Sequence, residues 1–335
     1  MAHSQTPPTA QPPQKPNRSG RWLALGGAIV LGIPLVAFAF DAFTFRQAEQ
    51  AYADAACDEA IAGYTGLVER WRPFDWQDYE VRSQSRIGEC TAYQTVSPLL
   101  ESTPTEALVA ASLFLDRYPN TELPVRQAVA SQVEGTAPDT LASVELCDAM
   151  PSVLNHGLLP APEQNLPFLQ YGCGQTYQAA GRYTEAVVQL QQFLVEYPEH
   201  EQTSAVEVAL ASAMFDEARA NNAGELPSPG VSGRTNSGTT QVEIRNDSPE
   251  PMRIIFSGAE TRFEELPGCE DCGVFTDGVP DACPEQGPVG TYTLQPGQYQ
   301  VLVRSVGDRS ITPFTGEWDL ADGYLHSNCF YVVQE

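Results

Sequence analysis

The residues with the clearest capacity for chemistry are Cys269 and Cys272, which form a Cys-x-x-Cys motif within LPGCEDCGVF. Two cysteines at this spacing can be a redox pair, half of a zinc site or part of a structural disulfide framework. A redox pair begins a helix, whose dipole lowers the thiol pKa. Here the following GVFTDGVPDACPEQGP cannot begin a helix of any length, and the carboxylates of Glu270 and Asp271 disfavour a thiolate. The motif therefore favours structural disulfides over redox chemistry.

Zinc remains an alternative, because four thiolates satisfy its tetrahedral coordination. The four candidate ligands are Cys269, Cys272, Cys283 and Cys329, with His326 near the last of them. A second closely spaced pair is missing, so we expect two disulfides instead. Their connectivity stays open among three possibilities, and we expect Cys329 to be joined to the loop from Cys269 to Cys283. We assign no catalytic, cofactor-binding or metal-binding residue.

The segment most relevant to location is 22–40, WLALGGAIVLGIPLVAFAF, which has no charged residue. A helix of this length just spans a bilayer core. Lys15, Arg18 and Arg21 precede it, which predicts a Pro-rich cytoplasmic tail over 1–21. A cleaved signal peptide ending at AFA is the alternative. Both interpretations export residues 41–335, so we expect a single-pass membrane protein with its bulk in the periplasm, or a secreted protein if the segment is cleaved.

The exported part is strongly acidic. The chain has 43 acidic and 18 basic residues, and no lysine follows Lys15. A surface of this charge repels phosphate backbones, so nucleic-acid binding is not expected. All eight cysteines lie after residue 40, and an even number of cysteines in an oxidising compartment favours disulfides.

Residues 41–220 have a helical pattern and repeat themselves. TEALVAASLFLDRYP at 105–119 matches TEAVVQLQQFLVEYP at 184–198, and DEAIAGYTGLVERWRP at 58–73 is a weaker copy. The stretch 167–198 resembles a tetratricopeptide repeat (TPR), and the ending FL-x-x-YP is similar to that of bacterial extracytoplasmic TPR proteins, which act as adaptors. Six residues carry the resemblance: Gly174, Tyr177, Gly181, Tyr183, Ala186 and Pro198. Gln170 and Phe193 depart from the family pattern.

The resemblance implies that successive helices pack in pairs, in the manner of a solenoid. Cys57 and Cys90 fall on successive helices, as do Cys147 and Cys173. We therefore expect the disulfides Cys57–Cys90 and Cys147–Cys173, against the alternative of four buried free thiols.

The composition changes after residue 220. Residues 221–238 are rich in Gly, Ser, Pro and Asn, which predicts a linker. Residues 239–335 alternate in short runs that predict a small β-sandwich. The expected strands are 241–246, 252–258, 290–294, 299–305, 315–320 and 328–334. The region is similar to a module attached to exported TPR proteins, and this resemblance implies no activity.

Together these features predict a multi-domain protein with an N-terminal transmembrane helix, an all-α TPR-like solenoid and a C-terminal all-β sandwich-like domain. We expect a non-enzymatic scaffold or adaptor without cofactors, which binds envelope proteins through its repeats while the N-terminal helix holds it at the membrane. Trp71, Phe74 and Trp76 are candidate partner contacts. The alternatives place a zinc enzyme or a carbohydrate-binding module in the β-domain, the latter using Trp318.

Overall fold

The computed structural model describes residues 39–70, 75, 77–235, 239–276, 282–307 and 311–333. The chain forms two compact units. The first comprises Met1–Glu101 and Phe114–Gln127, and the second comprises Ser102–Leu113 and Ala128–Glu335.

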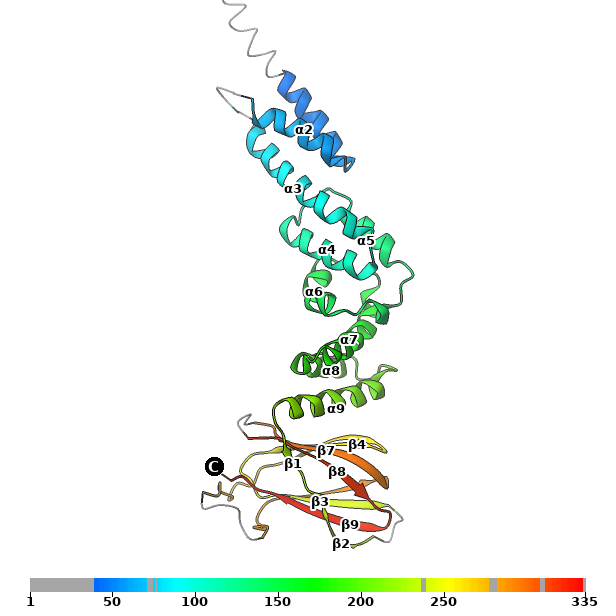
Figure 1. Cartoon of the computed structure of the whole chain (residues 1–335), viewed down its shortest axis with the longest axis vertical. Helices are drawn as coiled ribbons and strands as arrows, with labels where there is room; N and C mark the ends of the chain where they lie inside the picture. The colour runs from blue at the N-terminus through cyan, green and yellow to red at the C-terminus, as the bar shows by residue number, and fades with distance from the viewer. Residues whose placement is uncertain are drawn as a thin grey trace, which may run out of the picture. The chain divides into compact units, whose positions relative to one another are not determined.

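The helices come first along the chain (Figure 1). Residues 39–53 are helical. The helices that follow are α2 (Cys57–Val68), α3 (Tyr79–Leu100), α4 (Pro104–Arg117), α5 (Val125–Val133), the 3-10 helix η1 (Pro138–Leu141), α6 (Val144–Asn155), α7 (Pro162–Ala179), α8 (Tyr183–Glu196) and α9 (Thr203–Ala220). The strands are β1 (Gly224–Glu225), β2 (Gly230–Arg234), β3 (Thr240–Asn246), β4 (Met252–Gly258), β5 (Thr261–Leu266), β6 (Val289–Leu294), β7 (Gly297–Ser305), β8 (Phe314–Leu320) and β9 (Tyr324–Phe330).

In the first unit, the helix over 39–53 packs tightly against α2. Its buried side carries Phe45, Ala48 and Tyr52, which recur at helical spacing. A Cβ atom added to Gly63 of α2 would lie 2.9 Å from the Cβ of Ala48. The absence of a side chain at Gly63 therefore sets how closely these two helices approach.

The strands form two sheets in the second unit. The five-stranded sheet has the order β1-β8-β7-β4-β5, and the four-stranded sheet has the order β2-β9-β3-β6. Most neighbours are antiparallel, but β1 pairs with β8 and β3 pairs with β9 in parallel. Both sheets are therefore mixed.

The two sheets pack face to face around one apolar core (Figure 1). Val242 and Tyr292 come from the four-stranded sheet, and Phe256, Val301 and Trp318 come from the five-stranded sheet. The other face of the five-stranded sheet is also apolar at Ile255 and Leu302, which are fully buried. Helix α9 covers this face, and Arg304 of β7 pairs with Glu217 of α9 at 3.2 Å.

The expected fold class is wrong. Helices α6–α9 share one compact unit with both sheets, so the helices do not form a separate all-α solenoid, and parallel pairs make both sheets mixed. The protein has a mixed α/β fold. The physical reason is the apolar outer face of the five-stranded sheet, which a helix has to bury.

The expected transmembrane helix over 22–40 lies outside the described residues except for Ala39 and Phe40. These two residues begin a helix that continues with Asp41 and Arg46. None of the helices in the described part of the chain is long and apolar enough to cross a bilayer.

The segment 221–238 is not an unstructured linker in its described part. It contributes β1 to the five-stranded sheet and β2 to the four-stranded sheet. Composition did not indicate these strands, because Gly and Ser in β2 form an exposed edge with no alternation of apolar residues.

Candidate functional site

All eight cysteines form disulfides, which are Cys57–Cys90, Cys147–Cys173, Cys269–Cys272 and Cys283–Cys329. The two pairs expected among the helices are confirmed. The structure also resolves the connectivity that the sequence left open, because the Cys-x-x-Cys motif closes on itself. Cys329 of β9 is joined to Cys283, at the end of the loop to which we expected it to be tied.

The Cys-x-x-Cys motif lies in the loop after β5, and no helix follows it in the described residues up to 276. Cys269 is buried, Cys272 is half-buried, and Glu270 and Asp271 are exposed. Each sulfur is committed to a disulfide and is not available as a zinc ligand. In the described part of the chain, no group of three or more His, Cys, Asp or Glu side chains could hold a metal ion.

A buried polar cluster holds this loop in place. Asn246 donates from Nδ2 to the carbonyl oxygens of Glu250 and Pro267, both at 2.9 Å. The Oδ1 atom of Asn246 accepts hydrogen bonds from the amide and the hydroxyl of Ser248. The carbonyl oxygen of Ser248 in turn accepts a hydrogen bond from the Cys269 N–H at 2.8 Å. The cluster therefore anchors the residues directly before the motif.

Asp247 extends the cluster to the second disulfide loop. Its carboxylate accepts backbone hydrogen bonds from Glu285, Gln286 and Gly287 at 3.2, 2.8 and 2.6 Å. Cys283 lies just before these residues. The sequence indicated only a turn at DSPEP, and nothing in residues 246–248 shows which distant amides they bind. These hydrogen bonds thus hold in place both loops that carry the β-domain disulfides.

His326 of β9 is 4% exposed, and neither imidazole nitrogen has a hydrogen-bond partner among the described residues. Burial lowers the pKa of His326 from its usual 6.5, against the opposing effect of Asp319. The side chain faces the same way as Val242, its partner in the β3–β9 pair, and Val242 belongs to the core. His326 is therefore a neutral core residue at neutral pH.

Trp318, the residue on which a carbohydrate-binding surface would depend, is 1% exposed. Its indole packs in the core, and Nε1 donates to the Pro227 carbonyl at 3.0 Å. Trp318 offers no free face on which a sugar could stack.

The six residues of the repeat motif lie on or beside α7 and α8. A Cβ atom at Gly174 would lie 2.5 Å from the side chain of Leu190, and Ala186 is fully buried. Gly181 has a φ of +74°, which permits the tight turn between the two helices. Tyr183 begins α8, and Pro198 follows it.

Tyr177, the remaining residue of the motif, connects the hairpin formed by α7 and α8 to α6. Its hydroxyl donates to Asp148 at 2.9 Å, and Arg182 pairs with the same carboxylate at 2.8 Å while lying over the Tyr177 ring. Burial and the contact with Asp148 raise the pKa of Tyr177 to about 12. Cys147 precedes Asp148 and bonds to Cys173 of α7. The motif residues therefore have packing and pairing roles within this unit.

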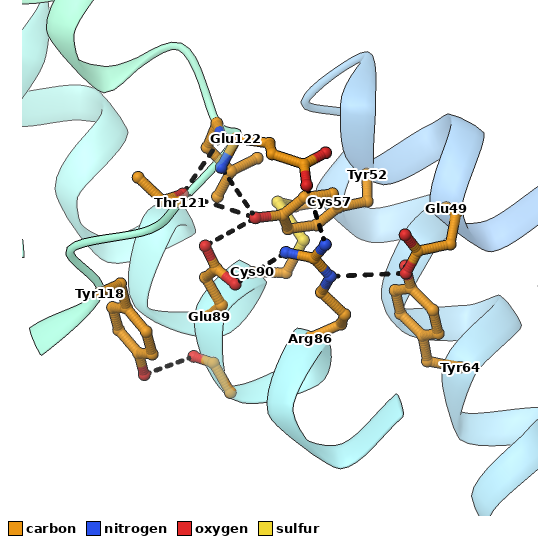
Figure 2. A network of polar contacts seen from close by, with 12 residues as sticks. Glu49, Tyr52, Cys57, Tyr64, Arg86, Glu89, Cys90, Tyr118, Thr121 and Glu122 are labelled. Carbon is orange, nitrogen blue, oxygen red and sulfur yellow. Dashed lines mark hydrogen bonds and ion pairs between the residues drawn. A yellow bond between two sulfur atoms is a disulfide. The ribbon is translucent and has the colours of Figure 1, made fainter. Parts of the chain in front are cut away.

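A cluster of charged groups in the first unit is centred on Arg86 of α3 (Figure 2). Its guanidinium pairs with Glu49, Glu89 and Glu122 at 3.4, 3.3 and 3.4 Å. The same group lies over the Tyr52 ring, 3.9 Å from its centroid. Sequence reasoning missed this cluster, because its members come from four separate segments.

Two tyrosines complete the network. Tyr52 donates to Glu89 and Tyr64 donates to Glu49, both at 2.6 Å (Figure 2). The Glu122 amide donates to the Tyr52 hydroxyl at 3.4 Å, which brings in the segment after α4. The buried disulfide Cys57–Cys90 lies beside the network, and Cys90 directly follows Glu89.

The pKa values describe what the network can do. Burial, reinforced by the hydrogen bond to Glu89, raises the pKa of Tyr52 to about 12, and burial with Glu49 raises that of Tyr64 further. Burial alone would lower the pKa of Arg86, but the interactions with Tyr52, Glu49 and Glu89 outweigh it and raise the pKa. These groups hold their protons throughout the physiological range. The arrangement favours fixed electrostatic pairing between helices over proton transfer.

Three aromatic residues expected as partner contacts, Trp71, Phe74 and Trp76, lie outside the described residues.

Comparison of the chain with known protein families and with characterised proteins finds no match to any of them.

Proposed function

We propose that this protein is a non-enzymatic, extracytoplasmic scaffold that binds other exported proteins of the cell envelope. The observation that carries the proposal is the pairing of every cysteine in a disulfide, in both compact units. Disulfides persist in oxidising compartments outside the cytoplasm. The acidic composition supports a protein partner over a nucleic acid.

The role of the side chains supports a scaffold over an enzyme. Arg86, Arg182 and Asp247, the centres of the three polar clusters, each bind groups of the protein itself. Their partners connect helices or loops, so the groups preserve the shape of the surface. A rigid surface loses less conformational freedom on binding, which favours affinity for a partner.

The test is affinity capture from envelope extracts with the intact chain, compared with two variants. Gly174→Leu places a large side chain where Leu190 already lies, and it should disturb the α7–α8 hairpin. Gly66→Leu is the matched control, since a Cβ at Gly66 meets no atom within 4 Å. We expect a defined set of exported proteins to be retained by the unmodified chain and by Gly66→Leu and lost by Gly174→Leu.

Two outcomes would contradict the proposal. One is the absence of any enriched protein under several ionic strengths, and the other is enrichment that does not change between the two variants. A complementary measurement is the thiol state of the protein in intact cells. Alkylation of any of the eight cysteines without prior reduction would place the chain in a reducing compartment.

A further inference from the structure

A pocket of about 380 Å³ lies in the second unit, between the last turns of α9 and the strands β1, β7 and β8. The apolar residues around it are Phe215 and Leu226, which are 1% and 5% exposed, and Pro227, which is exposed. Glu225 and Glu317 bring carboxylates to it from the segment after α9 and from β8. The volume is near the lower end of the range for ligand pockets, large enough for one side chain of a partner.

Contacts on each side fix the walls of this pocket. Arg219 of α9 donates to Gln300 of β7 at 3.2 Å, which joins the helix to the sheet at the rim. Trp318 donates to the carbonyl of Pro227, and the Ser228 hydroxyl donates to the carbonyl of Glu317 at 3.3 Å. A pocket held in this way needs little ordering when a ligand enters.

The charges of the pocket are not balanced from within. Arg219, the cation among its lining residues, is engaged by Asp216 at 3.2 Å and by Gln300, and it lies over the Phe215 ring. Among the described residues, neither Glu225 nor Glu317 takes part in an ion pair. The chain has no lysine after Lys15 and an excess of 25 negative charges.

We propose that this pocket receives a lysine or arginine side chain from the exported protein that the scaffold binds. The aliphatic stem of such a side chain packs beside the exposed Pro227, while its cationic head lies between the carboxylates of Glu225 and Glu317. Charge complementarity selects this occupant over an acidic or neutral segment. The inference deepens the proposed function and rests on it.

The test is an NMR titration of the isotope-labelled full chain with the capped tripeptide acetyl-Ala-Lys-Ala-amide. A capped tripeptide with norleucine in place of lysine is the control ligand, because it has a stem of similar length without the charge. Peptide concentrations reach about 10 mM, since one side chain supports only millimolar affinity. We expect shifts at amides of β1, β8 and the end of α9 with the lysine peptide alone, and we expect salt to weaken them.

Two variants assign the effect to the carboxylates. Glu225→Gln and Glu317→Gln should each weaken binding of the lysine peptide at least about threefold, because each removes one charge at the surface. Glu145→Gln on α6 is the control for net charge and should leave the affinity unchanged.

The proposal is overturned if the norleucine peptide produces the same shifts, if the shifts lie elsewhere, if none occur, or if the two variants bind as the unmodified chain does. Affinity capture separates this failure from failure of the proposed function. If partners are retained by Glu225→Gln/Glu317→Gln and lost by Gly174→Leu, the scaffold function is supported and the pocket has no part in binding them.

Discussion

Arg86 faces more negative charge than it can neutralise. Three carboxylates, those of Glu49, Glu89 and Glu122, surround one guanidinium, and Glu89 is nearly fully buried. Tyr52 and Tyr64 offset part of the excess by donating hydrogen bonds to two of these carboxylates. At the scale of single residues, Arg86 is thus the group on which the others depend.

Replacing Arg86 by Met keeps much of the side-chain volume and removes the charge. The variant leaves Glu89 buried without its cation, so we expect the first unit to lose about 3 kcal/mol of stability. Hydrogen exchange of the α2 and α3 amides measures this loss. Arg117→Met, at an exposed arginine that lies over Tyr118, is the control and should cost less than about 1 kcal/mol. The double variant Arg86→Met/Glu89→Gln should recover part of the lost stability. If Arg86→Met costs as little as Arg117→Met, Arg86 does not stabilise the first unit in this way.

His326 gives the β-domain a defined response to pH. Its pKa is lowered in the folded state, so the unfolded chain binds more protons once the pH falls below about 6.5. The contribution of neutral His326 to the free energy of unfolding is therefore fully present above that pH. It is lost as the pH falls toward the pKa of His326 in the folded state. We expect the β3 and β9 amides to exchange faster at pH 5.5 than at pH 7.5, relative to the same measurement on His326→Phe. The three other histidines remain in that variant, so their contributions cancel in the comparison. An equal pH dependence of exchange in both proteins would show that His326 is not the group responsible.

At the scale of elements, the α7–α8 hairpin depends on a missing side chain. A methyl group at Gly174 would lie 2.5 Å from the side chain of Leu190, which is fully buried and would have to shift. We expect Gly174→Ala to destabilise the second unit by about 1–3 kcal/mol. Chemical denaturation followed by circular dichroism measures the change.

The matched variant for this prediction is Gly66→Ala in α2, where the added methyl group meets open space. Alanine is favoured over glycine within a helix, so Gly66→Ala should stabilise its helix by about 0.5–1 kcal/mol. Leu190→Ala combined with Gly174→Ala should cost less than the sum of the two single changes, because the smaller residue at 190 makes room. Strict additivity would show that the two side chains do not meet.

At the scale of the whole molecule, the four disulfides differ in how open they are to a reductant. Cys57, Cys90, Cys147 and Cys173 are all buried, whereas Cys283 is exposed and Cys272 is half-buried. We therefore expect the two β-domain disulfides to be reduced first under native conditions. The helical pairs should react only after their units open.

Alkylation after graded reduction, followed by mass spectrometry, gives the order of these reactions. The two β-domain pairs should also differ in their effect on stability, since Cys283 and Cys329 are 46 residues apart in sequence and Cys269 and Cys272 only three. Loop-closure entropy predicts a loss of about 4 kcal/mol for Cys283→Ser/Cys329→Ser and about 2 kcal/mol for Cys269→Ser/Cys272→Ser. Early reduction of Cys57–Cys90 or Cys147–Cys173 would contradict the burial argument.

Local patterns in the sequence predicted the local elements well. The strand expected at 252–258 matches β4, and those expected at 290–294, 299–305 and 315–320 lie within β6, β7 and β8. The pairing of Cys57 with Cys90 and of Cys147 with Cys173 also followed from helices adjacent in the chain. These features depend on neighbours close in sequence, and periodicity is the direct trace of which side of an element is buried.

Tertiary structure decided what long-range contacts control. The last strand was expected at 328–334 but forms at 324–330, because β9 takes its register from β2 on one side and β3 on the other. The mixed sheets, the cover by α9, the cluster around Asn246 and Asp247 and the network around Arg86 arise in the same way. Their residues are polar or unpatterned in sequence, and they acquire partners only when segments far apart in the chain meet. Sequence alone determined the helical region and the strands β3, β4, β6, β7 and β8. Folding in three dimensions determined β1, β2 and β5, and it determined which elements lie together.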